Sequence, residues 1–186
     1  MKILMISGSR NPRGKTARCA LAVLEGAKKA GATVENAYLP SLTLERCRQC
    51  DEDGWGPCRR EGRCVIEDDF AGLVERIGRA DAVVFANPVY FGDLSESLRA
   101  FTDRLRRVSR FGEGRAECNG KPVVGVCAAG GGGGGAYSSC ASLYNVLERC
   151  GFDVADMIPV RRQNLEAKLA ALGLAGEWLA TSPRSE

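Results

Sequence analysis

Four cysteines lie close together in one segment of the chain, as Cys47, Cys50, Cys58 and Cys64, in the pattern C-x2-C-x7-C-x5-C. Four thiolates in one loop are what a 4Fe-4S cluster needs, because each iron takes one cysteine sulfur. The same thiolates could bind zinc, although zinc ribbons usually pair two knuckles of about two to four intervening residues. A thiol or disulfide switch is the third interpretation. The segment therefore predicts a metal or redox centre and leaves its chemistry open.

The remaining cysteines are dispersed on apolar, periodic segments, and we expect them to be small buried hydrophobic residues. They are Cys19, Cys118, Cys127, Cys140 and Cys150. The odd total of nine fits poorly with a fully paired disulfide framework. Histidine is absent from the sequence, which excludes Ser-His-Asp hydrolases and Cys-His proteases.

A loop of small, hydroxyl and basic residues, GSRNPRGKT, follows the first apolar run and leads directly into a helical segment. Backbone amides at such a helix start, with nearby hydroxyls and cations, would bind a phosphate dianion. The candidate phosphate ligands are Ser7, Ser9, Arg10, Gly14, Lys15 and Thr16. A Walker A loop is a competitor, but five residues separate Gly8 from Gly14, and the expected Walker B strand ends in Asn87. A solvated basic turn is the simpler alternative.

Two further strand ends carry residues suited to a flat ligand. NPVYFGD, from Asn87 to Asp93, combines a turn-fixing proline, the adjacent aromatics Tyr90 and Phe91, and a glycine that allows close backbone approach. The six glycines 130–135 follow the next apolar run. The aromatics could instead be packing residues, and the glycines a flexible loop. Because ligands bind beyond the carboxyl ends of parallel strands, three such loops predict a ligand site.

Short apolar runs alternate with longer segments of helical period, which predicts an α/β fold with a parallel sheet between two layers of helices. The expected strands are Ile3–Ser7, Thr33–Leu39, Ala82–Asn87, Pro122–Ala128 and Phe152–Ile158. The expected helices are Thr16–Ala30, Phe70–Ala80, Ser95–Val108 and Tyr137–Cys150. A last segment, Asn164–Thr181, has leucines at helical spacing and is either a closing helix or an arm that packs on a second subunit.

The length of 186 residues suits one domain, and we expect residues 1–186 to form one. Its C-terminal helical segment covers about residues 163–181. The cysteines lie in an insert after the second strand, at about residues 41–66, which is far longer than the ~2 to 6 residues usual for such connections. Residues 109–119 contain Gly112 and Gly114, and we expect a mobile surface loop there.

Charge and hydropathy indicate no macromolecular partner. The 26 basic and 23 acidic residues are scattered along the chain, so nucleic acid is not expected. No apolar run reaches the about 18 residues of a membrane span, and the opening MKILMISGS lacks the features of a secretory signal. We therefore expect a cytoplasmic protein without a membrane partner.

Three segments together resemble a known family. ISGSRNPRGKT, NPVYFGDLSESLRAFTDR and the glycine-rich loop before Tyr137 are similar to the FMN-contacting segments of the NADPH-dependent FMN reductase group in the flavodoxin-like superfamily. The resemblance is greatest to the iron-sulfur flavoprotein branch, whose cysteine motif ends in a sequence like CVIEDD, residues 64–69. The gap between Cys50 and Cys58 is longer here than in that branch, whose pattern resembles C-x2-C-x2-C-x5-C.

The resemblance implies a flavodoxin-like three-layer sandwich with a five-stranded sheet of order 2-1-3-4-5 and noncovalent FMN. It also implies a homodimer or homotetramer with the flavin near a subunit interface. Carried over by position, the phosphate ligands are those named above. The isoalloxazine would be lined by Pro88, Val89, Tyr90, Phe91 and Gly92, with Gly130 and Gly131 opposite.

We therefore expect an FMN-dependent oxidoreductase in which FMN accepts two electrons and a 4Fe-4S cluster passes them singly. No side chain is expected to act as an acid or base. The sequence does not choose between ferredoxin and NAD(P)H as the electron donor, because no separate G-x-G-x-x-G fingerprint opens a second βαβ unit. The alternatives are a cluster-free NAD(P)H-dependent FMN or quinone reductase and a zinc-stabilised interaction module without enzymatic activity.

Overall fold

The computed structural model describes residues 1–111 and 114–181. Its strands form one parallel sheet: β1 (Lys2–Ser7), β2 (Thr33–Tyr38), β3 (Ala82–Pro88), β4 (Pro122–Ala129) and β5 (Asp153–Arg161). The strand order is β2-β1-β3-β4-β5. The predicted α/β fold and the flavodoxin-like order are confirmed.

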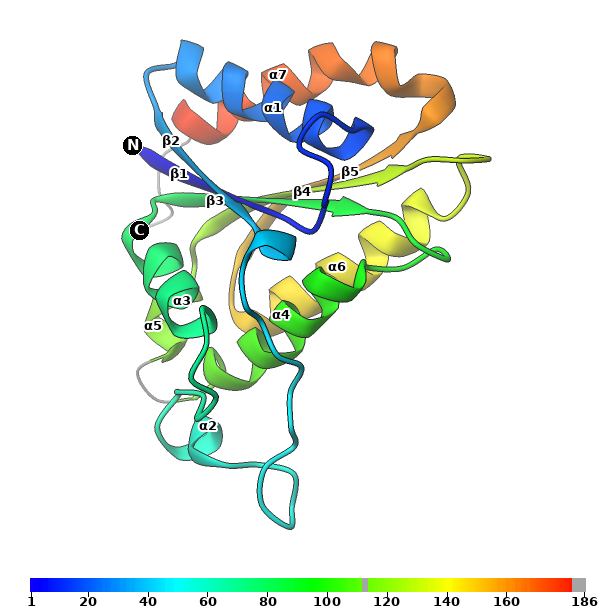
Figure 1. Ribbon diagram of the computed structural model, residues 1–186. Coiled ribbons are helices and arrows are strands. Elements are labelled where there is room, and N and C mark those ends of the chain that lie inside the picture. Colours follow the sequence, from blue (N-terminus) through cyan, green and yellow to red (C-terminus); the bar gives the residue numbers. More distant parts are fainter. Residues whose placement is uncertain (112–113, 182–186) are drawn as a thin grey trace.

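Helices cover both faces of the sheet (Figure 1). One face carries α1 (Lys15–Lys29) and α7 (Leu165–Thr181), which pack against each other. The other face carries α3 (Phe70–Arg79), α4 (Glu96–Val108), α5 (Gly114–Cys118) and α6 (Ala136–Cys150). The described residues also form three short helical turns: η1 (Leu39–Ser41), α2 (Pro57–Arg60) and η2 (Arg162–Asn164). Of the two roles considered for the last segment, the structure shows the closing helix.

The sheet separates two apolar cores, because side chains alternate between its faces. Ile3 and Met5 of β1 join the core under α1 and α7, whereas Leu4 and Ile6 join the core under the other helices. All seven residues of β3 are buried. This explains why its sequence is a nearly continuous apolar run, as expected for a strand covered on both faces.

The strand register brings three strand ends to one edge of the sheet. Ser7 of β1 lies beside Ala86 of β3, and Pro88 of β3 lies beside Ala128 of β4. The chain leaves β1 toward β2 and leaves β3 toward β4, so these neighbours form the point where the strand order reverses. Ligand sites of open α/β sheets lie at this point.

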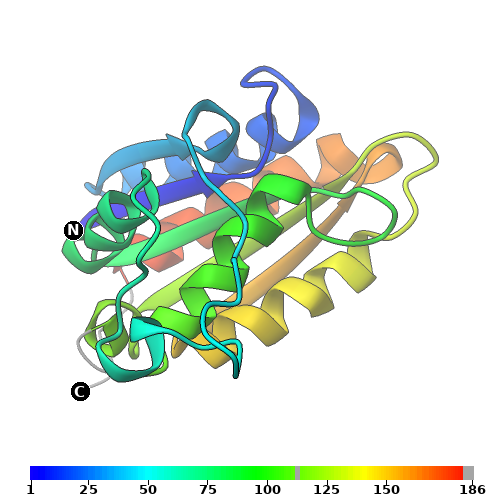
Figure 2. The same cartoon turned by 60° about the horizontal axis from the view of Figure 1, so that its bottom comes forward.

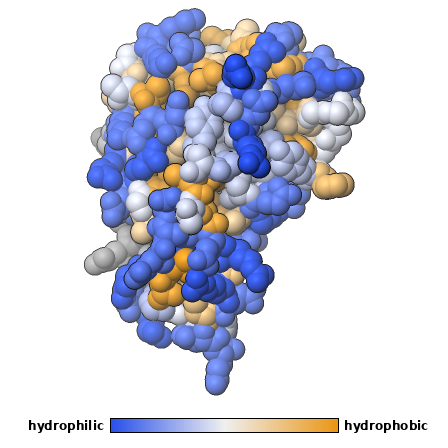
Figure 3. Space-filling model, viewed as in Figure 1, coloured by the Kyte–Doolittle hydropathy of each residue, from blue (hydrophilic) through white to orange (hydrophobic). Residues whose placement is uncertain are grey.

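The cysteine insert forms a lobe below the sheet. After η1 the chain runs alongside α4, turns through α2 and returns to α3 (Figures 1 and 2). In the space-filling view, hydrophobic atoms form a patch in this lobe and hydrophilic residues frame it (Figure 3). Within the described residues, no helix is long and apolar enough to cross a membrane.

Two expectations about element boundaries need correction. The mobile loop expected at 109–119 is wrong for Gly114–Cys118, which forms α5 and packs on α3; residues 112–113 lie outside the described part. Cys118 is fully buried in the core, and this tertiary burial is not visible in a glycine-rich local sequence. Strand β5 extends to Arg161, three residues beyond the expected end at Ile158, because its pairing with β4 continues to Ala129.

The α1–α7 contact provides a test of the packing. A Cβ atom added to Gly176 of α7 would collide with the carbonyl oxygen of Val23 in α1. Although alanine favours a helix by about 1 kcal/mol over glycine, we expect Gly176→Ala to lower the free energy of unfolding by about 1–3 kcal/mol through overpacking. Urea denaturation measures this.

The matched control is Gly72→Ala in α3, where an added Cβ meets nothing within 4 Å. We expect this variant to be as stable as the parent or up to about 1 kcal/mol more stable. A Gly176→Ala protein that gained as much stability as Gly72→Ala would contradict the close helix contact.

Candidate functional site

Loops from three strand ends line one open pocket of about 510 Å³. We call it the strand-tip pocket. Its lining residues are Ser9, Asn11, Gly14, Lys15, Thr16, Pro88, Val89, Tyr90, Ala128 and Gly130 to Gly134. The volume lies in the range of small-molecule sites, about 300–1,000 Å³. The three loops that the sequence singled out therefore meet at one site.

The first loop presents the start of α1 to this pocket. Gly14 is the N-cap residue, and no side chain in the described part of the protein caps the helix there. Lys15 and Thr16 follow it in the pocket wall. An uncapped helix start beside a lysine favours an anion, because the first amides of a helix lack intrahelical acceptors.

Ser7 and Arg10 do not line the pocket, unlike the other candidate phosphate ligands. Ser7 is fully buried, and its Oγ accepts a hydrogen bond of 3.2 Å from the backbone N–H of Ser9. Ser7 thus shapes the loop. Arg10 is exposed at the loop surface, whereas Asn11, which the sequence analysis did not name, is in the wall.

The buried side-chain amide of Asn87 joins the loops. Its Nδ2 donates to Ser139 Oγ of α6 at 2.8 Å and to the carbonyl oxygen of Asp93 at 3.3 Å. Its Oδ1 accepts the backbone N–H of Ser95 at 2.9 Å. Ser95 Oγ in turn lies 3.4 Å from the carbonyl oxygen of Gly8 in the first loop. Asn87 therefore links the loop after β3 to α4 and α6, and Ser95 extends this network to the loop after β1.

The two aromatics of the second loop have different positions. Tyr90 lines the pocket, whereas Phe91 is fully exposed and has a positive φ of 50°. Gly92 does not line the pocket. A Cβ on Gly135 would collide with the Cα atom of Gly92, so this glycine pair lets the second and third loops touch.

The glycine loop is held in place by residues at the end of β5. Arg161 Nε donates to the carbonyl oxygen of Gly133 at 3.0 Å. Gln163 Nε2 donates to the carbonyl oxygen of Gly132 at 2.9 Å. Sequence analysis missed both residues, because a glycine run gives no sign of its distant hydrogen-bond partners. The loop is anchored at both positions.

The four clustered cysteines line a second pocket, which we call the cysteine pocket. It is narrow, with a volume of about 20 Å³, and four arginines share its wall: Arg48, Arg63, Arg104 and Arg107. Among the described residues, no three potential ligands converge closely enough to hold a single metal ion. The cysteines therefore surround a common space without meeting at one point.

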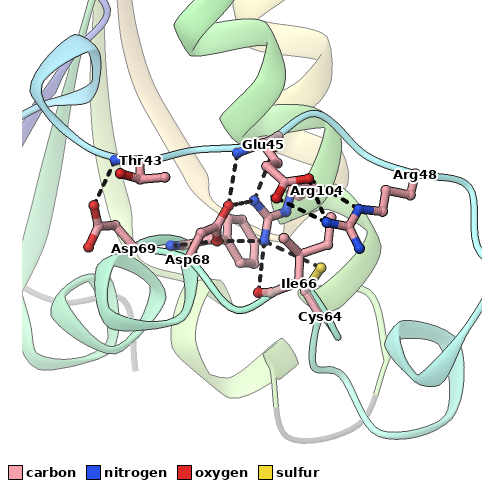
Figure 4. Close-up of polar contacts among 9 residues, drawn as sticks. Thr43, Glu45, Arg48, Cys64, Ile66, Asp68, Asp69 and Arg104 are labelled. Carbon is pink, nitrogen blue, oxygen red and sulfur yellow. Dashed lines mark hydrogen bonds and ion pairs between the residues drawn. The ribbon is translucent and has the colours of Figure 1, made fainter.

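Arg104 of α4 is buried between the two flanks of the cysteine insert (Figure 4). Its two terminal nitrogens donate to Asp68 Oδ2 and Oδ1 at 2.6 and 2.9 Å. They also donate to the carbonyl oxygen of Glu45 at 3.1 Å and to Cys64 Sγ at 3.4 Å. The side chains of Arg104 and Asp68 are each 1% exposed. This is a forked, charge-assisted pair inside the protein.

The ion pair shifts the pKa values of both partners. Burial alone would raise the pKa of Asp68, but hydrogen bonds from Arg104 and from the backbone N–H groups of Glu45 and Phe70 outweigh it and lower that pKa. Burial lowers the pKa of Arg104, and hydrogen bonds to Asp68 and Cys64 raise it to a larger extent. Both groups are therefore charged at neutral pH.

The dispersed cysteines are buried, as predicted: Cys19, Cys118, Cys127, Cys140 and Cys150. Burial raises the pKa of Cys19 to about 11 and that of Cys150 to about 12. These two groups are neutral thiols at physiological pH and behave as small apolar side chains.

The profile of the NADPH-dependent FMN reductase family matches residues 1–165. The chain belongs to the NADPH-dependent FMN reductase family. The resemblance noted in the loop sequences is confirmed, and membership in this oxidoreductase family implies FMN as the cofactor.

The curated proteins that resemble this chain include iron-sulfur flavoproteins. One from Methanocaldococcus jannaschii is 33% identical over 106 residues, which cover 57% of this chain and 52% of the relative. Another, from Methanosarcina thermophila, is 34% identical over 110 residues, which cover 58% of this chain and 55% of the relative. The chain thus aligns with about half the length of these curated relatives.

The fold also matches solved structures of reductases. The structure of an NAD(P)H:quinone oxidoreductase from Methanothermobacter marburgensis superimposes with a TM-score of 0.70 and 22% sequence identity. That match covers 100% of this chain and 99% of the other. At this identity the likeness shows the common fold.

The Arg104–Asp68 pair predicts a pH dependence of stability. The pKa of Asp68 is lower in the folded protein than in the unfolded chain, so its ionised form adds stability above about pH 4 that is lost as pH falls through the folded pKa. Asp68→Asn should cost about 3–5 kcal/mol near neutral pH, because Arg104 stays buried without its counter-ion. Urea denaturation between pH 7 and pH 2.5 measures the difference between the two proteins.

We expect the difference in unfolding free energy between the parent and Asp68→Asn to be constant above about pH 5. It should shrink below about pH 4, because the Asp68 carboxylate of the parent then becomes protonated. Glu35 and Asp93 also have lowered pKa values, but both remain in the variant and cancel in the comparison. Asp103→Asn, in an exposed pair with Arg106, is the control and should cost at most about 1 kcal/mol. A difference that stays constant down to pH 2.5 would refute the assignment.

Proposed function

We propose that this protein is an electron-transfer flavoprotein that binds FMN in the strand-tip pocket and a 4Fe-4S cluster at Cys47, Cys50, Cys58 and Cys64. The observation that carries the proposal is the presence of two pockets in one fold, of which one suits a flavin nucleotide and the other is lined by all four clustered cysteines. Bound FMN would exchange electrons in pairs or singly, and the cluster would exchange them one at a time.

The strand-tip pocket suits FMN in shape and charge. Added Cβ atoms at Gly130, Gly131 or Gly134 would meet nothing within 4 Å, so the glycine loop leaves open space along the pocket wall. The uncapped start of α1, with Lys15 and Thr16, provides the positive end for a phosphate. Pro88, Val89 and Tyr90 provide a flat apolar wall for the isoalloxazine.

The cysteine pocket suits a cluster better than a zinc ion. Zinc ribbons usually pair two knuckles of about two to four intervening residues, whereas five residues separate Cys58 from Cys64. A cluster places a separate iron at each thiolate. The four arginines in the wall also favour an anionic group. Because the pocket is narrow, we expect the insert to open as the group assembles.

The redox partner and the assembly belong to the same proposal. NAD(P)H or ferredoxin would supply electrons, and the protein would act as a homodimer or homotetramer. These points rest on the family resemblance. A cluster-free NAD(P)H-dependent reductase is the second candidate, and the description of the matched family as NADPH-dependent FMN reductases favours it.

Phosphate recognition can be tested by comparing FMN with riboflavin. Lys15→Met removes a cation from the pocket wall. We expect it to weaken FMN binding about 10- to 100-fold, since hydrogen bonds to charged groups contribute about 1.5–3 kcal/mol. Riboflavin lacks the phosphate, so its affinity should stay within about twofold. Fluorescence quenching during titration of the apoprotein measures both dissociation constants.

Lys29→Met is the matched control, because Lys29 lies exposed at the opposite end of α1. Its affinities for both flavins should equal those of the parent. Equal losses of FMN and riboflavin affinity in Lys15→Met would show that Lys15 does not recognise the phosphate.

The cluster can be tested by anaerobic purification and metal analysis. We expect about four iron and four sulfide per chain and broad absorption near 400 nm beyond the flavin bands. Cys58→Ser should lose the iron and sulfide and keep FMN, because Cys58 lines only the cysteine pocket. Cys19→Ala, at a buried cysteine of α1, is the control and should keep both groups.

The same measurement separates the alternatives. One zinc per chain without sulfide would identify a zinc site, and FMN without any metal would identify the cluster-free reductase. A colourless protein that takes up no FMN would instead favour the interaction module.

A further inference from the structure

Arg104 is a fully buried charged side chain that FMN binding does not use. It lies in the second half of α4, lines the cysteine pocket and is absent from the strand-tip pocket. Burying a cation is costly unless it is paired and hydrogen-bonded. Asp68 supplies the pair, and the remaining hydrogen bonds of Arg104 go to the cysteine insert. The guanidinium is therefore built into that site.

The guanidinium joins both ends of the insert. At the entry it donates to the carbonyl oxygen of Glu45, and at the exit to Asp68 and Cys64 (Figure 4). Backbone N–H groups of Thr43 and Glu45 also donate to Asp69 Oδ2 and Asp68 Oδ2, at 2.7 and 2.8 Å, so several hydrogen bonds hold the two ends together. Cys47 follows the entry by two residues and Cys64 lies at the exit. Arg104 thus brings the first and last cysteines of the motif to the same pocket.

Two further features mark the guanidinium as oriented. Its CZ atom lies over the ring of Phe70 at 4.2 Å from the centroid, which fixes the plane of the fork. Its Nε is the one buried side-chain nitrogen or oxygen in the described structure without a hydrogen-bond partner. A purely structural ion pair would be expected to satisfy this donor, because an unmet buried donor costs about 1–3 kcal/mol.

We propose that Arg104 is a positioning residue for Cys64 in the proposed 4Fe-4S site and that its N–H···S hydrogen bond and positive charge raise the reduction potential of the cluster. This inference rests on the proposed function. Hydrogen bonds to cluster sulfurs and net charge set such potentials. Reduction adds a negative charge, so a buried cation beside the sulfur stabilises the reduced cluster more than the oxidised one.

The experiment compares two double variants in the complete FMN-bound protein. Arg104→Met with Asp68→Asn removes both charges and leaves no buried ion unpaired, which limits the loss of stability. Arg106→Met with Asp103→Asn is the matched control on the same helix, where the pair is partly exposed and its N···O distance is 3.0 Å. Iron, sulfide and FMN are counted, and the cluster and flavin potentials are measured by anaerobic redox titration.

We expect the Arg104/Asp68 variant to keep FMN with an unchanged flavin potential. At the midpoint potential of the wild-type cluster, the ratio of reduced to oxidised cluster in this variant should be about tenfold lower. This corresponds to a reduction potential lower by about 59 mV for one electron. The control should match the wild type in every readout. Loss of the cluster alone, with FMN kept, would also support the positioning of Cys64.

Arg104→Lys keeps the charge without the fork. The Arg104→Lys variant tests the role of Arg104 if the double variant does not fold. We expect it to contain less cluster, or a cluster of lower reduction potential, than the wild type. Full cluster content at the wild-type potential, in either Arg104 variant, would overturn the inference and leave the proposed function intact. Wild-type protein without iron and sulfide would instead refute the proposed cluster, and the role of Arg104 with it.

Discussion

The carboxyl ends of β1, β3 and β4 must finish at the same edge of a parallel sheet, and the candidate flavin site depends on this constraint. The register places Ser7 beside Ala86 and Pro88 beside Ala128, so the loops that follow start at nearly the same level. The chain leaves β1 and β3 in opposite directions, which keeps the space above them free of a crossing helix. Asn87 then ties the loop after β3 to α4 and α6 through a single amide.

Sequence patterns were sufficient for the five strands, the longer helices and most of the pocket wall. The apolar runs are strands because both faces of the sheet are covered, and the loops at their ends lie together because strand ends share an edge. Most of the candidate residues, from Ser9 to Gly131, therefore line the pocket. Arg10 and Phe91 do not, because residue type alone cannot show which way a loop turns. Their contact with FMN stays a prediction, as does that of the residues in the wall.

Long-range partners could not be predicted from local patterns. Arg104 and Asp68 are 36 residues apart, and Arg161 reaches Gly133 from a different strand. A signal was present at Arg104, which follows Phe101 by three residues and directly precedes Leu105 on the buried stripe of α4. A charged residue at the edge of such a stripe indicates a buried counter-ion. Only the folded chain shows that this counter-ion is Asp68.

Helix α4 connects the two pockets. Ser95, its N-cap, donates its backbone N–H to Asn87, which directly precedes Pro88 of the strand-tip pocket, and Arg104 lies nine residues later at the cysteine pocket. With a rise of about 1.5 Å per residue, the helix sets these positions about 14 Å apart along its axis. A one-residue insertion between them would turn Arg104 by about 100° and point it away from the insert. The number of residues in this stretch therefore constrains the protein as much as the identity of Ser95 and Arg104 does.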